Sequence, residues 1–225
     1  AQTMVDIGKL AGKPVVAVIT SMAQPLGTHI GNALEVKDAI DVLAGRTQGD
    51  LLEISLLLGS HMLVLAEKAR TLPEARAMLE NALSSGAGLR KLAEMIAAQG
   101  GDPRVVEDLS LLPQAAVKRV MRAETAGYLS AMDTTALGMA AQRMGAGRAK
   151  KSDMLDYSVG YVLHVRLGDE VTEDTPLATL YARNEAEAEE AEKAIRKALT
   201  IAKEKPSVPP LWDAVVTAEG ITYNR

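Results

Sequence analysis

The sequence contains no cysteine and no phenylalanine, and aromatic residues make up only 3% of it. The absence of cysteine excludes disulfide bonds and thiol catalysis. With so few aromatic side chains, the hydrophobic core has to be built from Leu, Val, Ile, Ala and the ten methionines.

Several classes of partner also lack support in the sequence. The formal net charge of −4 gives no electrostatic reason to expect nucleic acid or an anionic membrane as a partner. The three histidines, His29, His61 and His164, are far apart and do not have the spacing of a zinc site. No apolar run approaches the roughly 20 residues that a bilayer-spanning helix requires, and no secretory signal is visible. These absences predict a cytoplasmic protein.

The 225 residues, 48% of them hydrophobic, suffice for one large core or for a larger and a smaller domain. The first seven residues read as the middle of a helix without an N-cap, so we expect the chain to be the later part of a longer protein. Residues 14–20 form an apolar, β-branched run that predicts a buried strand of an α/β sheet.

The pattern then divides the chain near residues 110–115. Before this point the spacing of apolar residues predicts helices; after it, short β-type runs predominate, interrupted by two helices. A proline-containing stretch at 203–210 reads as an extended linker. The predicted helices are 1–11, 32–43, 51–69 capped by Asp50, 73–84, 86–99, 134–144 and 185–198, and the predicted later strands are 116–121, 127–132, 159–166 and 177–182.

The loop between the first strand and the helix at 32–43 is the main candidate for a functional site, because α/β proteins place ligands at the carboxyl ends of parallel strands. Glu35 has two readings. If Asn32 caps the helix, the Glu35 carboxylate bonds back to the amide of the cap, which is a structural role. Alternatively, Glu35 joins the free backbone carbonyls of Leu26 and His29 in binding an oxygen-loving cation such as potassium. Spacing alone leaves these two readings balanced.

The motifs along the chain resemble those of the pyrimidine-nucleoside phosphorylase and thymidine phosphorylase family. The resemblance covers almost the whole chain in the expected order, and its motifs are SMAQPLGTHIGNALEV (21–36), LGSHM (58–62), AAQGGD (97–102), AMDTTALGMAAQRMGAGR (131–148), SDMLDYSVGY (152–161) and RLGDEV (166–171). It implies a mixed α/β fold: residues 1–112 as the later part of the large central α/β domain, and residues 113–225 as a C-terminal α+β, barrel-sandwich-like subdomain.

The resemblance also implies an activity and a cofactor. The expected activity is that of a pentosyltransferase, in which inorganic phosphate as co-substrate cleaves uridine or thymidine to the free base and a (deoxy)ribose 1-phosphate. Potassium-binding members use two carbonyls and a glutamate of this loop and helix, here Leu26, His29 and Glu35. The phosphate loop, the catalytic histidine and the base-holding residues of the family belong to an N-terminal half that this sequence does not show. We therefore expect no catalytic residue in this chain, an inactive isolated chain, the N-terminal half as a partner, and the homodimer of the family.

Other features of the sequence keep alternative functions open. Gly145–Lys151 combines two glycines with three cations but follows a helix, as a C-cap does, and is more typical of a solvated turn than of a phosphate site. Residues 160–180 resemble half of a biotinyl or lipoyl carrier domain, but neither Lys150 nor Lys151 lies between two such strands. The alternatives to a phosphorylase are thus a non-enzymatic barrel-sandwich module and a phosphoribosyltransferase-like enzyme.

Overall fold

The computed structural model describes residues 1–224, which form seven α-helices and ten strands in three antiparallel sheets. The helices are α1 (Gln2–Leu10), α2 (Asn32–Leu43), α3 (Asp50–Leu65), α4 (Leu72–Ser84), α5 (Ala87–Ala98), α6 (Thr134–Ala141) and α7 (Glu185–Ala198). The strands are β1 (Ala17–Thr20), β2 (His29–Ile30), β3 (Val117–Arg122), β4 (Gly127–Met132), β5 (Gly160–Leu163), β6 (Glu170–Val171), β7 (Pro176–Ala182), β8 (Leu199–Ala202), β9 (Trp212–Thr217) and β10 (Gly220–Tyr223). None of the described helices is both long enough and apolar enough to cross a membrane. The predicted mixed α/β fold class is confirmed.

The chain folds into two compact units that are discontinuous in sequence. The first unit comprises Ala1–Ser21, Val42–Lys91 and Pro209–Arg225, and the second comprises Met22–Asp41 and Leu92–Val208. Residues 22–41, which carry the candidate loop, thus pack with the later part of the chain. The division at residues 112 and 113 stays a prediction about family domains.

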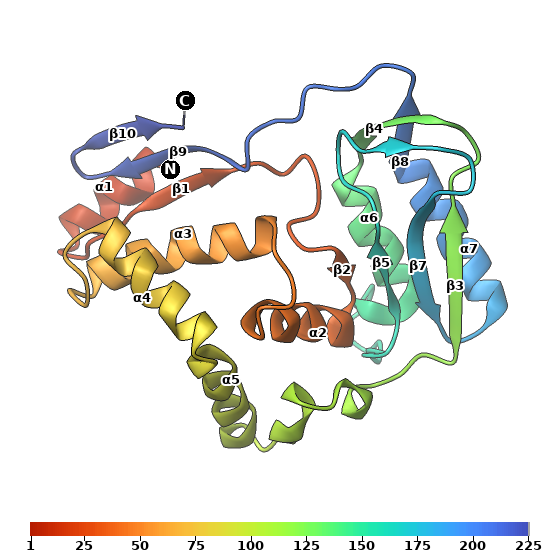
Figure 1. Ribbon diagram of the computed structural model, residues 1–225, viewed down its shortest axis with the longest axis horizontal. Coiled ribbons are helices and arrows are strands. Elements are labelled where there is room, and N and C mark those ends of the chain that lie inside the picture. The colour runs from red at the N-terminus through yellow and green to blue at the C-terminus, as the bar shows by residue number, and fades with distance from the viewer. Residues whose placement is uncertain (225) are drawn as a thin grey trace. The chain divides into compact units, whose positions relative to one another are not determined.

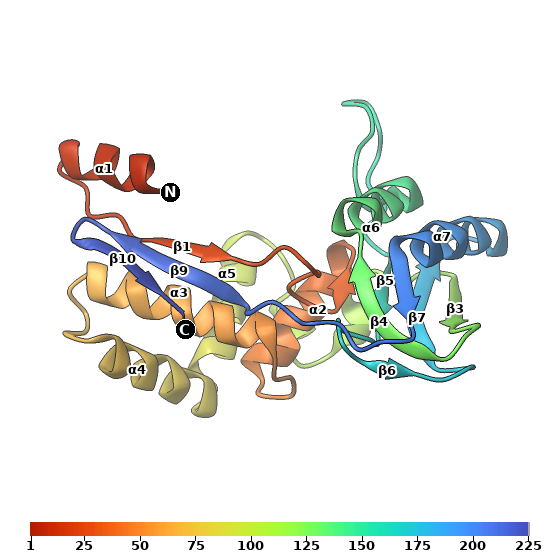
Figure 2. The ribbon, with the colours of Figure 1, turned by 90° about the horizontal axis from the view of Figure 1, so that it is seen from above.

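The first unit is built on a three-stranded sheet of order β1-β9-β10. Figure 2 shows α1 on one side of this sheet and α3 and α4 on the other. Leu52 and Leu56 of α3 pack with Val42 and with Leu79 and Leu83 of α4 into a small apolar cluster. The N-cap of α3 is Gly49, whose residue type offers no capping side chain, so the prediction that Asp50 caps this helix is wrong.

The expectation of a buried first strand is also wrong. β1 pairs antiparallel with β9 and is half-exposed, with Ile19 37% exposed. A short apolar run has the same appearance in a buried parallel strand and in a strand that packs on one face only, so periodicity could not tell them apart.

The second unit contains a four-stranded sheet of order β2-β5-β7-β3 and a three-stranded sheet of order β6-β4-β8, neither closed into a barrel. Helices α6 and α7 lie together on one face of the strands β5, β7 and β3 (Figure 1). The core between these layers includes Leu129, Leu137, Tyr161, Leu180 and Ile195, none of them more than 1% exposed. The six elements predicted between residues 116 and 198 correspond to β3, β4, α6, β5, β7 and α7, and the unit also contains β2, β6 and β8, which were not predicted.

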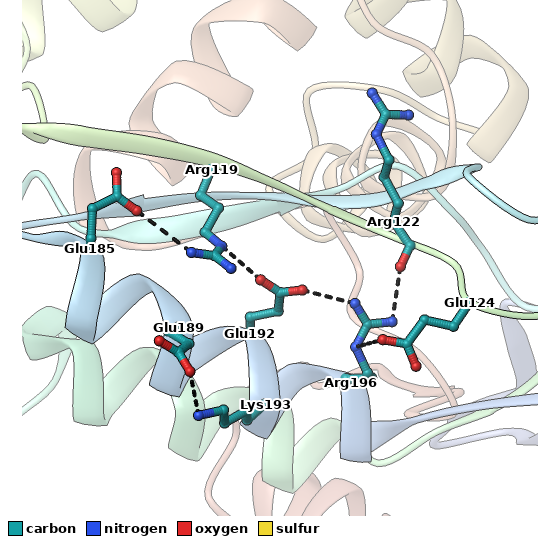
Figure 3. A network of polar contacts seen from close by, with 8 residues as sticks. All are labelled: Arg119, Arg122, Glu124, Glu185, Glu189, Glu192, Lys193 and Arg196. Atoms are coloured by element: carbon teal, nitrogen blue, oxygen red, sulfur yellow. Dashed lines mark hydrogen bonds and ion pairs between the residues drawn. The ribbon is translucent and has the colours of Figure 1, made fainter.

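A network of ion pairs joins α7 to β3 (Figure 3). The Glu192 carboxylate, 19% exposed, accepts hydrogen bonds from Arg119 Nε and Arg196 Nη2, both at 2.8 Å. Arg196 also donates to the carbonyl of Arg122 at 2.9 Å. One carboxylate thus links the helix to an edge strand of the sheet.

Candidate functional site

The candidate loop is anchored to the second unit by the short strand β2. His29 lies opposite Val162 and Ile30 opposite Tyr161 in an antiparallel pairing with β5, and the Leu163 N–H donates to the Thr28 carbonyl at 2.8 Å. In an antiparallel ladder, bonded and non-bonded pairs alternate. Since Thr28 and Leu163 form a bonded pair, the N–H and C=O of His29 point away from β5. The His29 carbonyl is therefore not used by the pairing of β2 with β5, although His29 lies in a strand rather than in the irregular part of the loop.

Two glycines allow the loop to approach β5 closely. A Cβ atom on Gly160 would lie 2.1 Å from the Ile30 carbonyl oxygen, and one on Gly31 would lie 2.5 Å from the Val159 carbonyl oxygen. Both residues have positive φ angles, +148° and +139°, which L-residues rarely adopt. Only glycine at both positions lets the two backbones meet at this distance.

Glycine also marks the start of α2. The Glu35 N–H donates to the Gly31 carbonyl at 2.8 Å, and the Glu35 carboxylate accepts from the Gly31 N–H at 3.4 Å. Asn32 is the first helical residue, and its side-chain amide donates to the Ala146 carbonyl at 2.8 Å. The carboxylate thus reaches Gly31 rather than the amide of Asn32. At 3.4 Å this hydrogen bond is long and therefore weak, and Glu35 is exposed.

The Leu26 carbonyl lies beside a cation that belongs to the protein. Arg166 Nη1 donates to the Pro25 carbonyl at 2.6 Å, and Nη2 lies 3.5 Å from the Leu26 carbonyl oxygen. The positive charge of the guanidinium opposes a second cation at Leu26, although the long second contact leaves most of the accepting capacity of that oxygen unused.

A second carboxylate, which the sequence reasoning missed, lies near His29. Asp38 is only 4% exposed, and its Oδ1 is 3.5 Å from His29 Nδ1, which also lies 3.0 Å from the Thr28 hydroxyl. Burial lowers the pKa of His29, and the negative charge of Asp38 partly offsets this effect. Asp38 follows Leu34 by one helical turn, and a polar residue on the buried face of a helix is the signal that could have identified it.

The residues present fit a monovalent cation in part. The free carbonyl of His29 and the exposed carboxylate of Glu35 are suitable oxygen donors. The carbonyl of Leu26 is less suitable, because it already accepts a hydrogen bond from the positively charged Arg166. Within residues 1–224, no group of three or more His, Cys, Asp and Glu side chains is arranged to hold a metal ion. An ion site here would thus depend mainly on backbone oxygens, as potassium sites do.

The fold brings the Gly145–Lys151 turn next to Glu35. Gly31, Asn32, Glu35, Gln142 and Gly147 are among the residues that line a pocket of about 230 Å³. The turn follows α6 through a π-helical segment, η3 (Gln142–Ala146), in which Gly145 has a φ of +107°. The turn therefore ends a helix, as the sequence indicated, and its three cations are exposed.

The remaining sequence candidates are not among the residues that line this pocket. His164 follows β5, and its Nε2 lies 2.7 Å from the Thr179 hydroxyl. The backbone amide of Lys150 donates to the Asp153 carboxylate in a turn, so this lysine is not presented at the tip of a hairpin as in a carrier domain.

His61 lies in the first unit, on α3. Its Nε2 is buried and has no hydrogen-bond partner within residues 1–224. Burial lowers the pKa of this histidine. A neutral, packed histidine agrees with the structural role that its apolar helix indicates.

Comparison with known proteins gives matches to both parts of the chain. A family described as "Glycosyl transferase family, a/b domain" matches residues 1–89, and "Pyrimidine nucleoside phosphorylase C-terminal domain" matches residues 128–202. Proteins named pyrimidine-nucleoside phosphorylase are similar along most of the chain. Those from Geobacillus stearothermophilus and Bacillus subtilis (strain 168) are each 49% identical over 185 residues, which are 82% of this chain and 43% of the relative. The relative from Staphylococcus aureus (strain USA300) is 42% identical over 217 residues, 96% of this chain and 50% of the relative.

The chain spans about half the length of these curated relatives. The matches cover both structural units and agree with the motifs on which the resemblance rests. The chain therefore belongs to the pyrimidine-nucleoside phosphorylase family, a family of pentosyltransferases, and includes its C-terminal domain.

Proposed function

We propose that this chain is part of a pyrimidine-nucleoside phosphorylase and contributes to phosphorolysis together with the N-terminal half that the resemblance implies. In this reaction an oxygen of inorganic phosphate forms a bond to the anomeric carbon of the nucleoside. The glycosidic C–N bond breaks, its electron pair leaves with the base, and the base takes up a proton. The observation that carries the proposal is the 42–49% identity to proteins of that name over most of this chain.

The role of this chain in the reaction is to position groups rather than to supply a nucleophile. The expected transition state has oxocarbenium character, which calls for a preorganised polar surrounding. The loop at residues 24–31 suits such a role, because the sheet and the two glycines fix its backbone while the His29 carbonyl stays free. The glycines permit the close approach of the loop to β5, and they supply no group for acid–base chemistry.

We further propose a potassium ion bound by the carbonyls of Leu26 and His29 and the carboxylate of Glu35. When bound, the ion would supply a fixed positive charge at this loop. The free His29 carbonyl and the weakly committed Glu35 carboxylate support this assignment. Asp38 is the competing carboxylate, because it is buried and lies close to the His29 side chain.

The activity is tested by assembling this chain with the first half of the Geobacillus stearothermophilus relative. The purified 225-residue chain and the assembled protein are each incubated with phosphate and with uridine or thymidine, and free base is measured by chromatography. We expect release of base only from the assembled protein. Turnover by the isolated chain contradicts the proposal that it depends on the other half. An assembly that is folded but inactive contradicts the proposed phosphorolysis.

The ion site is tested with Glu35→Gln and Asp38→Asn in the same active assembly, with potassium exchanged for sodium at constant ionic strength. If Glu35 is the ligand, Glu35→Gln raises the half-activating potassium concentration by about tenfold or more and leaves the KM for uridine unchanged. The same change seen only in Asp38→Asn moves the ligand role to Asp38. An unchanged response in both variants contradicts the site and leaves Glu35 its contact with Gly31.

The cytoplasmic location and the homodimer of the family belong to this proposal for the whole protein. Light scattering on the assembled protein measures its oligomeric state, and a monomer contradicts the dimer. The same assay of uridine against thymidine gives the substrate preference.

A further inference from the structure

Two motifs that lie about 140 residues apart in the sequence meet at the candidate loop. Arg166 donates to the carbonyls of Pro25, at 2.6 Å, and of Leu26, at 3.5 Å. The N–H of Leu167 donates to the Gln24 side-chain oxygen at 2.9 Å. Three successive loop residues are thus held by two successive residues of the turn that follows β5.

The turn itself is fixed to the core of the second unit. The Arg166 N–H donates to the Asp169 carboxylate at 2.7 Å, which closes the turn. The Gly168 N–H donates to the Leu129 carbonyl at 2.8 Å, and the Leu129 N–H donates to the Asp169 carbonyl at 2.9 Å. Leu129 is fully buried in β4. Arg166 therefore extends from a turn that is hydrogen-bonded to β4 onto residues 24–26, which lie outside the helices and strands.

The chemistry of the contact suits arginine in particular. A guanidinium carries several N–H donors in a planar fork and can hold two carbonyls at once, whereas a lysine ammonium is a single point charge. Hydrogen bonds from a charged donor are also stronger than neutral ones. Because Pro25 has no N–H, its carbonyl is its only backbone polar group, and Arg166 occupies it.

We propose that Arg166 is a positioning residue, which fixes the backbone of residues 24–29 so that the loop has its active conformation. This inference rests on the proposed function, because it assigns the loop a place in phosphorolysis. Arg166 acts through Pro25 and Leu26 and does not touch the reacting atoms. It makes the active conformation of the loop depend on the C-terminal subdomain.

The structural part is tested by hydrogen exchange in the 225-residue chain. Two amides report on the loop: Leu163, which donates to the Thr28 carbonyl, and Leu167, which donates to Gln24. In Arg166→Gln we expect both amides to exchange about tenfold faster, because the loss of one hydrogen bond to a charged group makes local opening about tenfold more frequent. Arg166→Lys should restore part of the protection. Unchanged exchange at both amides in Arg166→Gln overturns the inference.

Arg122→Gln is the matched control. Arg122 Nη1 also donates to a backbone carbonyl, that of Asp174, at 2.7 Å, but far along the chain from the loop. This variant should leave Leu163 and Leu167 unchanged. Faster exchange at these amides in the control shows a general loss of stability and overturns a specific role of Arg166.

The catalytic part uses the assembled enzyme. We expect Arg166→Gln to lower kcat about tenfold with a KM for uridine within about twofold, because a misplaced loop removes interactions made in the transition state. Arg166→Lys should recover part of kcat, and Arg122→Gln should keep the wild-type rate. A normal kcat in Arg166→Gln despite faster loop exchange overturns the positioning role. If the wild-type assembly is inactive while the loop amides respond as expected, the proposed function is wrong. The hydrogen bonds by which Arg166 fixes the loop backbone are then still supported.

Discussion

The two compact units differ in the size of their buried apolar clusters. The second unit contains a continuous core in which Leu129, Tyr161 and Leu180 are completely buried. In the first unit the cluster of Val42, Leu52 and Leu56 is small. Both units expose large apolar side chains, such as Leu10 in the first and Met154 in the second, each 89% exposed. The difference indicates that the second unit is stabilised by its own core, and that the candidate loop is part of this unit.

Helix α3 shows the difference within one element. It buries Leu52 and Leu56, yet Leu58, Met62 and Leu65 on its other side are 36–68% exposed. A helix that is apolar on several faces is typical of a protein interior rather than of a surface. Apolar exposure of this kind is uncommon on a self-sufficient monomeric unit.

The largest expected effect tests the two cores directly. Leu180→Ala removes a fully buried side chain from the second unit and should lower the free energy of unfolding by about 2–5 kcal/mol. Leu10→Ala is the same substitution at an 89% exposed site in the first unit and should change it by about 0.5 kcal/mol or less. Urea unfolding followed by circular dichroism measures both. Equal losses in the two variants contradict the contrast between the units.

A pair of glycines tests whether the loop belongs to the second unit. Gly160→Ala places a Cβ 2.1 Å from the Ile30 carbonyl oxygen at a φ of +148° and should cost about 2–4 kcal/mol. Gly138→Ala lies within α6 with open space around it and should stabilise by about 0.5–1 kcal/mol. The same urea experiment compares them. A mild effect of Gly160→Ala would mean that the loop and β5 separate easily.

The ion pairs of α7 should have a smaller effect. Glu192→Gln removes the charge that links Arg119 to Arg196 and leaves the two guanidinium groups facing a neutral amide, at an expected cost of about 1–2 kcal/mol. Glu189→Gln breaks only an exposed pair with Lys193 and should cost clearly less. Thermal unfolding in low and high salt checks both. A larger loss in Glu189→Gln would show that the network does not stabilise the unit.

Much of the fold could be predicted from local patterns. The helix at 185–198 and the strand at 127–132 agree with α7 and β4 residue by residue, and Asn184 caps the helix. β2, β6, β8, β9 and β10 were missed. Strands of two to six residues carry little periodic signal, and the partners of β2, β6 and β8 lie far away in the sequence, whereas β9 and β10 form a hairpin.

The candidate site could be predicted only in part, for the same reason. Glycine and proline marked the loop, although His29, expected in its irregular part, lies in the short strand β2. The contact of Arg166 with Pro25 and the approach of Asp38 to His29 depend on tertiary folding, so no local pattern contained them. The potassium site stays a prediction.

The smallest expected effect concerns pH and compares a histidine of each unit. Burial lowers the pKa of His29 below its ordinary value of 6.5, and burial does the same for His61 in the first unit. Below about pH 6.5 the unfolded chain binds a proton that the folded chain resists, so folding stability falls as the pH decreases and is level above pH 7. His29→Asn and His61→Asn should each remove part of this slope, measured as the free energy of unfolding between pH 5 and 8. Direct titration by nuclear magnetic resonance gives the sign of the pKa shift independently. A folded pKa above 6.5 for His29 would mean that the charge of Asp38 outweighs burial. Folding stability would then increase on acidification.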